Sequence, residues 1–288
     1  MSWATPPESR KGVRRAGDTI RGLDSVQARI GDEYRVINTW RGAHGFPLNT
    51  FQITLRNRAR TIDPDALVAQ RLKRFEAIRV KLQRFPEMKL DRMQDIGGCR
   101  AVMPTLKDVR SLARQYGEGK RLRHELVGKK SYIDQPKDSG YRSEHAVFRY
   151  TPAGTAQEPW EGLRVEVQIR TSLQHAWAAA VETVDIFTGS GLKTETNYER
   201  DWRRFFVLMG TAMALAENTP VVPGTSGDRR EVALEVKELA ERLDVVGSMN
   251  TWASIVDHTS VAQRGTFYLL IVEPATQSVR VAAFGKKK

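Results

Sequence analysis

Two acidic residues, Asp95 and Glu166, lie in segments that the sequence predicts to form a β-sheet. Asp95 is at the entrance of one strand, and Glu166 is on the polar face of another. Asp95 stands at the entrance of the apolar run "GGCRAVM", whose glycines permit close approach of the backbone. In "LRVEVQIR", polar and apolar residues alternate strictly, so the polar ones share one face. These polar residues are Arg164, Glu166, Gln168 and Arg170. Two acids on neighbouring strands could bind Mg²⁺, and one could also position a nucleophile. Taken alone, Asp95 would be a turn residue and the polar face a solvated edge.

Basic residues are frequent in the segments before and after Asp95. The segment "QRLKRFEAIRVKLQRF" contains Arg71, Lys73 and Lys81, and Arg100 lies within the strand after Asp95. A basic helix face is usually a solvated surface, but a triphosphate beside a metal-binding acid would need such charges. The loop "YGEGKRLRHELVGKK" adds Lys120, Arg121, Arg123, Lys129 and Lys130. That loop would be plain surface charge or would hold a longer polyanion such as tRNA.

The stretch "PKDSGYRSEHAVFRY" crowds two cations, an aromatic ring and a histidine around Gly140. These residues are Lys137, Tyr141, Arg142 and His145. A turn followed by a strand requires none of them. The loop is therefore a candidate binding element.

The elements that position these residues alternate between helices and strands. Helices are predicted over 7–39 and 65–85, and strands over 97–103, 143–150 and 163–170. Thr171 or Ser172 would cap the next helix, and a buried helix would follow over 200–218. Residues 219–230 have the composition of a linker, followed by a helix near 231–243 and two strand-like runs joined by a hairpin turn. This order predicts a mixed sheet with helices against it and a small C-terminal element.

Composition limits the class of protein. The 288 residues contain 46 Lys and Arg against 34 Asp and Glu, a net charge of +12, which favours polyanionic partners. The single cysteine, Cys99, excludes an internal disulfide and fits a reducing compartment. The N-terminus lacks the apolar core of a signal peptide, and no window approaches the about 18 apolar residues of a membrane helix. We expect a soluble, cytoplasmic protein without a membrane partner.

Four segments, in this order, resemble the RelA/SpoT-type synthetase domain over roughly residues 60–190. They are "RLKRFEAIRVKL", "DIGGCRAV", "YIDQPKDSGYRSEH" and "VEVQIRT". The resemblance implies an α+β, nucleotidyltransferase-like mixed sheet within residues 1–219. It also implies ATP-dependent transfer of β,γ-pyrophosphate to the 3′-hydroxyl of GDP or GTP, or of the tRNA 3′ end in a toxic subset, some used in phage defence.

The same resemblance implies a role for each candidate residue. Asp95 would bind Mg²⁺, and Glu166 would share the metal or deprotonate the attacking hydroxyl. The ATP phosphates and adenine would be held by Arg71, Lys73, Lys81 and Arg100. The acceptor-binding set would be Lys137, Tyr141, Arg142, His145, Gln168 and Arg170. Within it Tyr141 would stack on the acceptor base, and Arg142 would support the loop. His175 ranks lowest.

Some features depart from the family pattern. Ser139 replaces an asparagine, Glu144 replaces a leucine, and Arg74 with Phe75 replaces a small polar residue and a proline. No His-Asp dyad in suitable context precedes the synthetase segments, so we expect no hydrolase half. The element at 231–288 would cover the ATP site, recruit a regulatory partner or complete the fold. Two alternatives to an enzyme remain, a nonenzymatic nucleic-acid-binding module and a degenerate synthetase that senses nucleotides.

Overall fold

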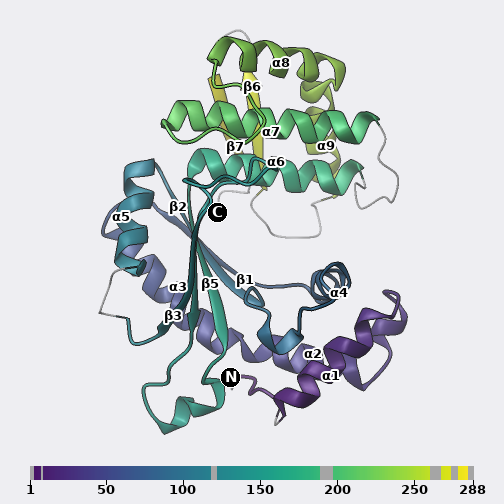
Figure 1. The fold of residues 1–288 in the computed structure, drawn as a ribbon, viewed down its shortest axis with the longest axis vertical. Helices are drawn as coiled ribbons and strands as arrows, with labels where there is room; N and C mark the ends of the chain where they lie inside the picture. Colours follow the sequence, from purple (N-terminus) through teal and green to yellow (C-terminus); the bar gives the residue numbers. More distant parts are fainter. Residues whose placement is uncertain are drawn as a thin grey trace. The chain divides into compact units, whose positions relative to one another are not determined.

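The computed structural model describes residues 3–7, 9–117, 122–188, 197–259, 267–273 and 278–284 (Figure 1). The chain forms two compact units. Unit 1 comprises Met1–Lys130 and Glu144–Arg170, and unit 2 comprises Ser131–Ser143 and Thr171–Lys288. Within the described residues, none of the helices combines the length and apolar character that a bilayer crossing demands.

A five-stranded mixed sheet forms the centre of unit 1. Its strands are β1 (Leu67–Leu72), β2 (Gly97–Met103), β3 (Glu125–Ser131), β4 (Glu144–Arg149) and β5 (Arg164–Thr171). They lie in the order β1-β2-β5-β4-β3, and both β1 with β2 and β4 with β5 are antiparallel. Strands β2, β4 and β5 lie where strands were predicted, at 97–103, 143–150 and 163–170. The mixed sheet with helices against it confirms the predicted α+β fold class.

Helices cover one face of this sheet. α3 (Gly45–Arg60) packs against β1 and β2, and α5 (Leu106–Gly117) packs against β2 and β4. Phe148 of β4 contacts Phe51 of α3 and Tyr116 of α5, so its neighbour across the strands, Val165, faces the same helices. A Cβ at Gly97 would meet His44 and Leu48 at 3.4 and 3.6 Å, which places alternate β2 residues against α3. The polar positions of β2, β4 and β5 therefore share the opposite face.

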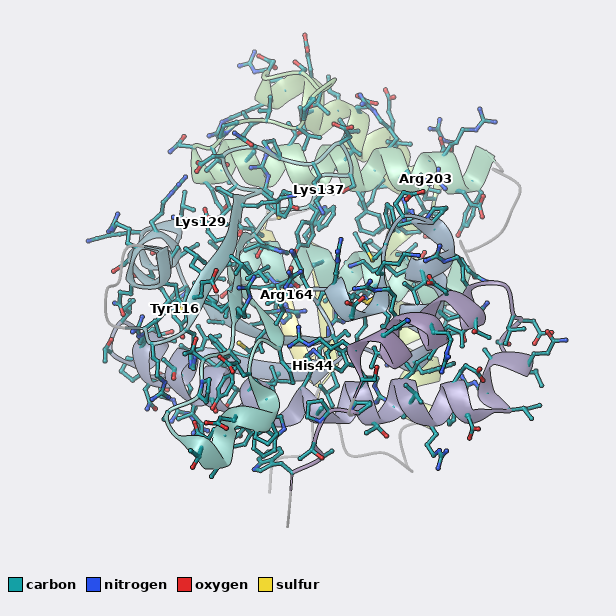
Figure 2. The ribbon with its side chains drawn as sticks, turned by 60° about the horizontal axis from the view of Figure 1, so that its bottom comes forward. His44, Tyr116, Lys129, Lys137, Arg164 and Arg203 are labelled. Carbon is teal, nitrogen blue, oxygen red and sulfur yellow. The ribbon has the colours of Figure 1, made fainter. Side chains whose placement is uncertain are left out.

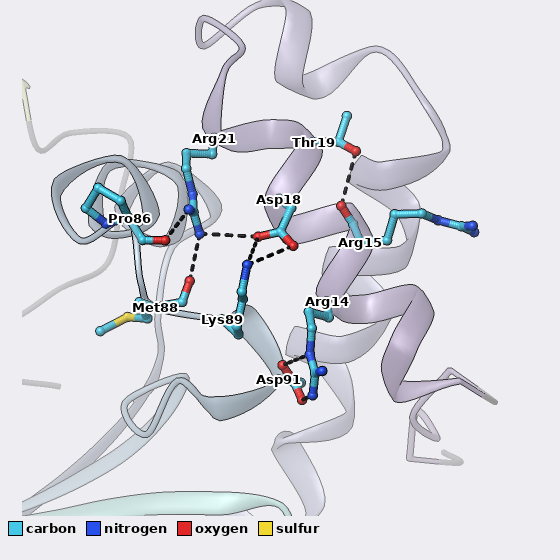
Figure 3. Close-up of polar contacts among 9 residues, drawn as sticks. All are labelled: Arg14, Arg15, Asp18, Thr19, Arg21, Pro86, Met88, Lys89 and Asp91. Atoms are coloured by element: carbon cyan, nitrogen blue, oxygen red, sulfur yellow. Dashed lines mark hydrogen bonds and ion pairs between the residues drawn. The ribbon is translucent and has the colours of Figure 1, made fainter.

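The N-terminal helices hold the segment that leads into β2. The helical elements are α1 (Arg10–Arg21), η1 (Gln27–Arg29), α2 (Asp32–Ala43), α4 (Phe75–Arg84) and η2 (Leu90–Arg92). In Figure 3, Arg14 of α1 forms a bidentate pair with Asp91, at 3.1 and 2.8 Å. Arg21 donates to the carbonyls of Pro86 and Met88. These contacts fix the backbone just before Asp95.

Three element predictions in unit 1 need correction. Residues 65–85 form strand β1 and helix α4 instead of one helix, because the backbone of β1 pairs with β2 in an antiparallel ladder. Residues 7–39 form separate helices, since the chain breaks near Gly22 and Gly31. The predicted basic loop includes strand β3, and Lys120 and Arg121 lie outside the described residues.

Unit 2 is a helical layer with a two-stranded sheet. It contains α6 (Ser172–Thr188), α7 (Asn197–Glu217), α8 (Arg229–Arg242), α9 (Val245–Thr259), β6 (Phe267–Glu273) and β7 (Ser278–Phe284). Thr171 caps α6, as predicted, by accepting from the Gln174 amide at 3.2 Å. β6 and β7 are antiparallel, and the hairpin turn predicted between them lies outside the described residues.

The C-terminal helices share a hydrophobic core with α6 and α7. Trp177, Trp202, Leu239 and Met249 are buried together, and Arg204 of α7 pairs with Glu235 of α8 at 2.8 Å. Val222, in the predicted linker, is fully buried, and its amide donates to Thr211. The boundary at 220–230 stays a prediction, but the described contacts join α8 to α7 instead of separating them.

Candidate active site

Asp95 lies between two lysines in unit 1. Its Oδ2 atom is 2.9 Å from Lys73 Nζ and 2.8 Å from Lys81 Nζ. Lys73 is held by its backbone amide, which donates to the Ile96 carbonyl at 2.7 Å and extends the β1–β2 pairing. Burial opposes ionisation of Asp95, but the ammonium groups of Lys81 and Lys73 outweigh it and lower the pKa of the carboxyl. The predicted metal acid and two predicted phosphate ligands are therefore neighbours.

The second oxygen of Asp95 has the properties of a cation ligand. Oδ1 is buried and accepts no hydrogen bond from any described residue. Among those residues, no cluster of three or more His, Cys, Asp and Glu forms a protein-only metal cage. Mg²⁺ in nucleotide sites commonly takes one or two carboxylates and completes its shell with phosphates and water. The Asp95 carboxylate fits that requirement.

Glu166 is fixed by hydrogen bonds at both carboxylate oxygens. Oε1 is 2.7 Å from His145 Nδ1, and Oε2 accepts from Gln168 Nε2 at 2.9 Å. The β4–β5 register sets His145 directly opposite Gln168, so both side chains converge on Glu166. Burial opposes ionisation, but His145 and then Gln168 outweigh it and lower the pKa of Glu166. The charge of Asp95 acts in the opposite sense, so the two carboxylates lie within electrostatic reach.

The predicted arginine ligands lie on or beside the same sheet face. Arg71 is opposite Gly98 in the β1–β2 register, and Arg100 is opposite Ala69, so both side chains share the face opposite α3. Arg170 is buried at the end of β5 and donates to Gln168 Oε1 at 3.5 Å, a long contact. Among the predicted site residues of unit 1, the structure thus brings Asp95 together with its two lysines. It brings Glu166 together with His145 and Gln168.

Unit 2 carries a cluster of two tyrosines and a lysine. Lys137 Nζ lies 4.2 Å from the ring centroid of Tyr132 and 5.2 Å from that of Tyr141. The two rings meet edge to face at 5.9 Å, and Tyr141 also meets Trp177 edge to face. Cation–π contacts of this kind orient the lysine without neutralising it. Sequence reasoning missed Tyr132, because no local pattern within the loop indicates that its ring meets Lys137.

Arg142, which the resemblance placed in the acceptor-binding set as a support of the loop, is buried among protein acceptors. The side chain is 1% exposed and donates to the carbonyls of Ile133, Gly210 and Pro220 and to Thr219 Oγ1. A guanidinium with this many protein acceptors joins the loop to the end of α7. These contacts fit the support of the loop that the resemblance implied.

Two glycines bring the loop and α7 together. Gly140 has φ +85°, and a Cβ there would lie 3.0 Å from the Phe206 carbonyl oxygen. A Cβ at Gly210 would lie 2.8 Å from the Cα of Gly140. Because these distances leave no room for a side chain, both positions require glycine. Gly210 was missed, since an isolated helical glycine carries no local sign of its distant partner.

Residues 70–185 match the family model described as the region found in RelA / SpoT proteins. An uncharacterized protein of Mycobacterium tuberculosis, Rv1366, is 30% identical over 201 residues, which is 68% of this chain and 65% of the relative. The chain thus spans slightly less than two thirds of that relative. GTP pyrophosphokinase YwaC of Bacillus subtilis is 33% identical over 115 residues, 38% of this chain and 52% of that protein.

Solved structures share the fold. The small alarmone synthetase 2 of Bacillus subtilis superposes with a TM-score of 0.52 and 19% identity, covering 65% of this chain and 95% of that one. The small alarmone synthetase 1 of the same organism, bound to its product pppGpp, gives a TM-score of 0.50 and 20% identity. That match covers 60% of this chain and 88% of the synthetase.

Proposed function

Because residues 70–185 of this chain belong to the RelA/SpoT family, we propose that the protein is an ATP-dependent pyrophosphokinase acting on GDP or GTP. The observation that carries the proposal is the pair of fixed carboxylates, Asp95 with two lysines and Glu166 with His145 and Gln168. A nucleic-acid-binding module without catalysis would need neither arrangement.

The donor phosphates would be bound by the cations around Asp95. Lys73 and Lys81 are already beside this carboxylate, and Arg71 and Arg100 project from the same sheet face. Asp95 would hold Mg²⁺ through Oδ1, with Glu166 as the second carboxylate of the site. Bound there, the metal supplies charge neutralisation for the transferred phosphates.

Glu166 would accept the proton of the acceptor 3′-hydroxyl. The hydroxyl oxygen attacks the β-phosphorus of ATP, the bond from that phosphorus to the α–β bridging oxygen breaks, and AMP leaves. Such a transfer depends on in-line positioning and charge stabilisation more than on covalent catalysis. His145 and Gln168 hold the two oxygens of Glu166 in place, so the base is oriented before the reaction.

The guanosine base would stack on Tyr141. Lys137, held against the Tyr132 and Tyr141 rings, would contact acceptor phosphate or ribose. Tyr132 is a further positioning residue for Lys137, because its ring lies nearer to the ammonium than that of Tyr141 does.

A second acceptor, the 3′ end of tRNA, is favoured by one specific observation. The net positive charge of the chain resides in unit 1, which has 31 Lys and Arg against 18 Asp and Glu. Unit 2 has 15 against 16. A nucleoside diphosphate does not need an excess of this size, whereas a polynucleotide would use it.

The deciding experiment offers ATP labelled at the β or γ phosphate, with Mg²⁺, to GDP, GTP and deacylated tRNA in separate reactions. Label in a guanosine nucleotide that disappears with Glu166→Gln supports the first acceptor, and label on tRNA supports the second. If Glu166→Gln transfers label as fast as the wild type, the assignment of the base is wrong.

A further inference from the structure

Four arginines gather at the far end of the polar sheet face, outside the residues assigned to pyrophosphate transfer. They are Arg10 of α1, Arg92 of η2, Arg149 of β4 and Arg164 of β5. Arg164 is labelled in Figure 2. It stands two residues before Glu166 on the same strand face, a separation of about 7 Å along the strand.

The strand register places two of these arginines directly opposite each other. Arg149 and Arg164 are Cα partners in the β4–β5 ladder. Like charges in directly opposite positions destabilise a sheet. Burial and then the charges of Arg149, Arg10 and Arg92 lower the pKa of Arg164, so all four guanidinium groups act on one locality.

Backbone carbonyls, rather than acids, hold two members of this group. Arg164 Nη1 donates to the Arg92 carbonyl at 2.9 Å, and Arg10 Nη2 donates to the Glu161 carbonyl at 3.0 Å. A carbonyl fixes a guanidinium without cancelling its charge. Arg149 does pair with Glu125 at 2.9 Å, but both side chains are about half exposed, where such a pair is weak.

The acid whose charge acts on Arg164 has its own partner. Asp91 acts on Arg164 in the opposite sense to the arginines, but its carboxylate is bound by Arg14 in bidentate geometry (Figure 3). The locality therefore keeps an excess of positive charge, and carbonyls hold the guanidinium groups of Arg164 and Arg10 in place. Guanidinium groups held in this way are suited to phosphate oxygens.

We propose that Arg10, Arg92, Arg149 and Arg164 form a binding site for the backbone phosphates of RNA. Several arginines from four elements exceed what one nucleotide phosphate requires, and unit 1 carries the whole positive excess of the chain. Phosphate contacts of this type give affinity and orientation without reading sequence. The proposal does not depend on pyrophosphate transfer, because binding is measured without ATP.

The test measures binding of fluorescently labelled deacylated tRNA to the full chain over a range of salt concentrations. We expect Arg149→Gln with Arg164→Gln to weaken binding on the order of tenfold and to reduce the slope of log K against log salt by about 1 to 2. The double lysine variant, Arg149→Lys with Arg164→Lys, should retain most of the binding, since it keeps the charge.

The matched control removes two arginines from α3, which covers the other sheet face, as Arg56→Gln with Arg60→Gln. Equal weakening by this control would show that only net charge matters and would overturn the site. Unchanged tRNA binding by the double variant Arg149→Gln with Arg164→Gln would also overturn it. If the double variant does not fold, tRNA binding is measured for Arg149→Gln alone. The slope of log K against log salt for the wild type then gives a second test, because a slope near zero contradicts phosphate binding.

Discussion

Glu166 accepts hydrogen bonds at both carboxylate oxygens, and this limits its freedom to rotate away from a substrate. His145 contacts one oxygen and Gln168 the other, from neighbouring strands. The resemblance assigned His145 to the acceptor, and the structure adds a contact that orients the proposed base. A residue that positions another should affect turnover more than substrate binding.

We predict that His145→Ala lowers kcat by about 10- to 100-fold, the usual cost of losing a group that orients a catalytic one. His145→Asn should retain more activity than alanine, because its amide nitrogen can take the place of Nδ1. The KM for ATP should change little in both variants. Initial rates over a range of ATP and acceptor concentrations separate the two parameters. Equal losses in the Asn and Ala variants would indicate that His145 acts on the substrate and not through Glu166.

At the scale of elements, the acceptor loop depends on its contact with α7. Gly140 and Gly210 approach each other so closely that neither position has room for a Cβ. Arg142 adds hydrogen bonds from the loop to the end of the same helix. The position of Tyr141 and Lys137 is thus set by packing within unit 2.

Gly210→Ala should force the loop away from α7, at a cost of about 1–3 kcal/mol in the free energy of unfolding. It should also raise the KM for the guanosine nucleotide while leaving the KM for ATP unchanged. Gly12→Ala on α1 is the matched control, since its Cβ would meet Ser9 at 3.7 Å, an ordinary contact, and alanine favours a helix. Urea unfolding and steady-state kinetics measure both effects. A variant at Gly210 as stable and active as that at Gly12 would contradict the close packing.

At the scale of the whole molecule, unit 1 carries the net positive charge and a buried histidine that makes its stability depend on pH. Its excess of basic residues contrasts with the near balance of unit 2. His44, labelled in Figure 2, is buried beneath the sheet with Nδ1 2.8 Å from the Trp40 carbonyl. Burial lowers the pKa of His44 to about 4, against 6.5 for an ordinary histidine.

The unfolded chain therefore binds a proton at His44 at a higher pH than the folded chain does. Stability from the neutral imidazole is complete above about pH 6.5 and is lost as pH falls toward 4, by up to about 3 kcal/mol. We expect the urea midpoint of the wild type to fall more steeply over this window than that of His44→Asn, whose amide can still donate to Trp40. Parallel pH profiles for the two proteins would show that His44 does not carry this effect.

The sequence by itself was enough to nominate the candidate site residues and to predict three strands of the sheet. Asp95, Glu166 and the strand at 163–170 were predictable because alternation and glycine pairs are local signals. Segment 65–85 was not, because Leu67, Val68 and Leu72 satisfy a helical period as well as a strand, and only pairing with β2 selects the strand.

Only the tertiary structure decided which polar groups meet. The contacts of Asp95 with Lys73 and Lys81, and of Glu166 with His145, join residues 14 to 22 positions apart through strand register and helix packing. Tyr132 beside Lys137, Gly210 against Gly140 and the buried hydrogen bonds of Arg142 also depend on the folded backbone. Local sequence fixes residue type and periodicity, whereas contact between distant residues is set by how the elements pack.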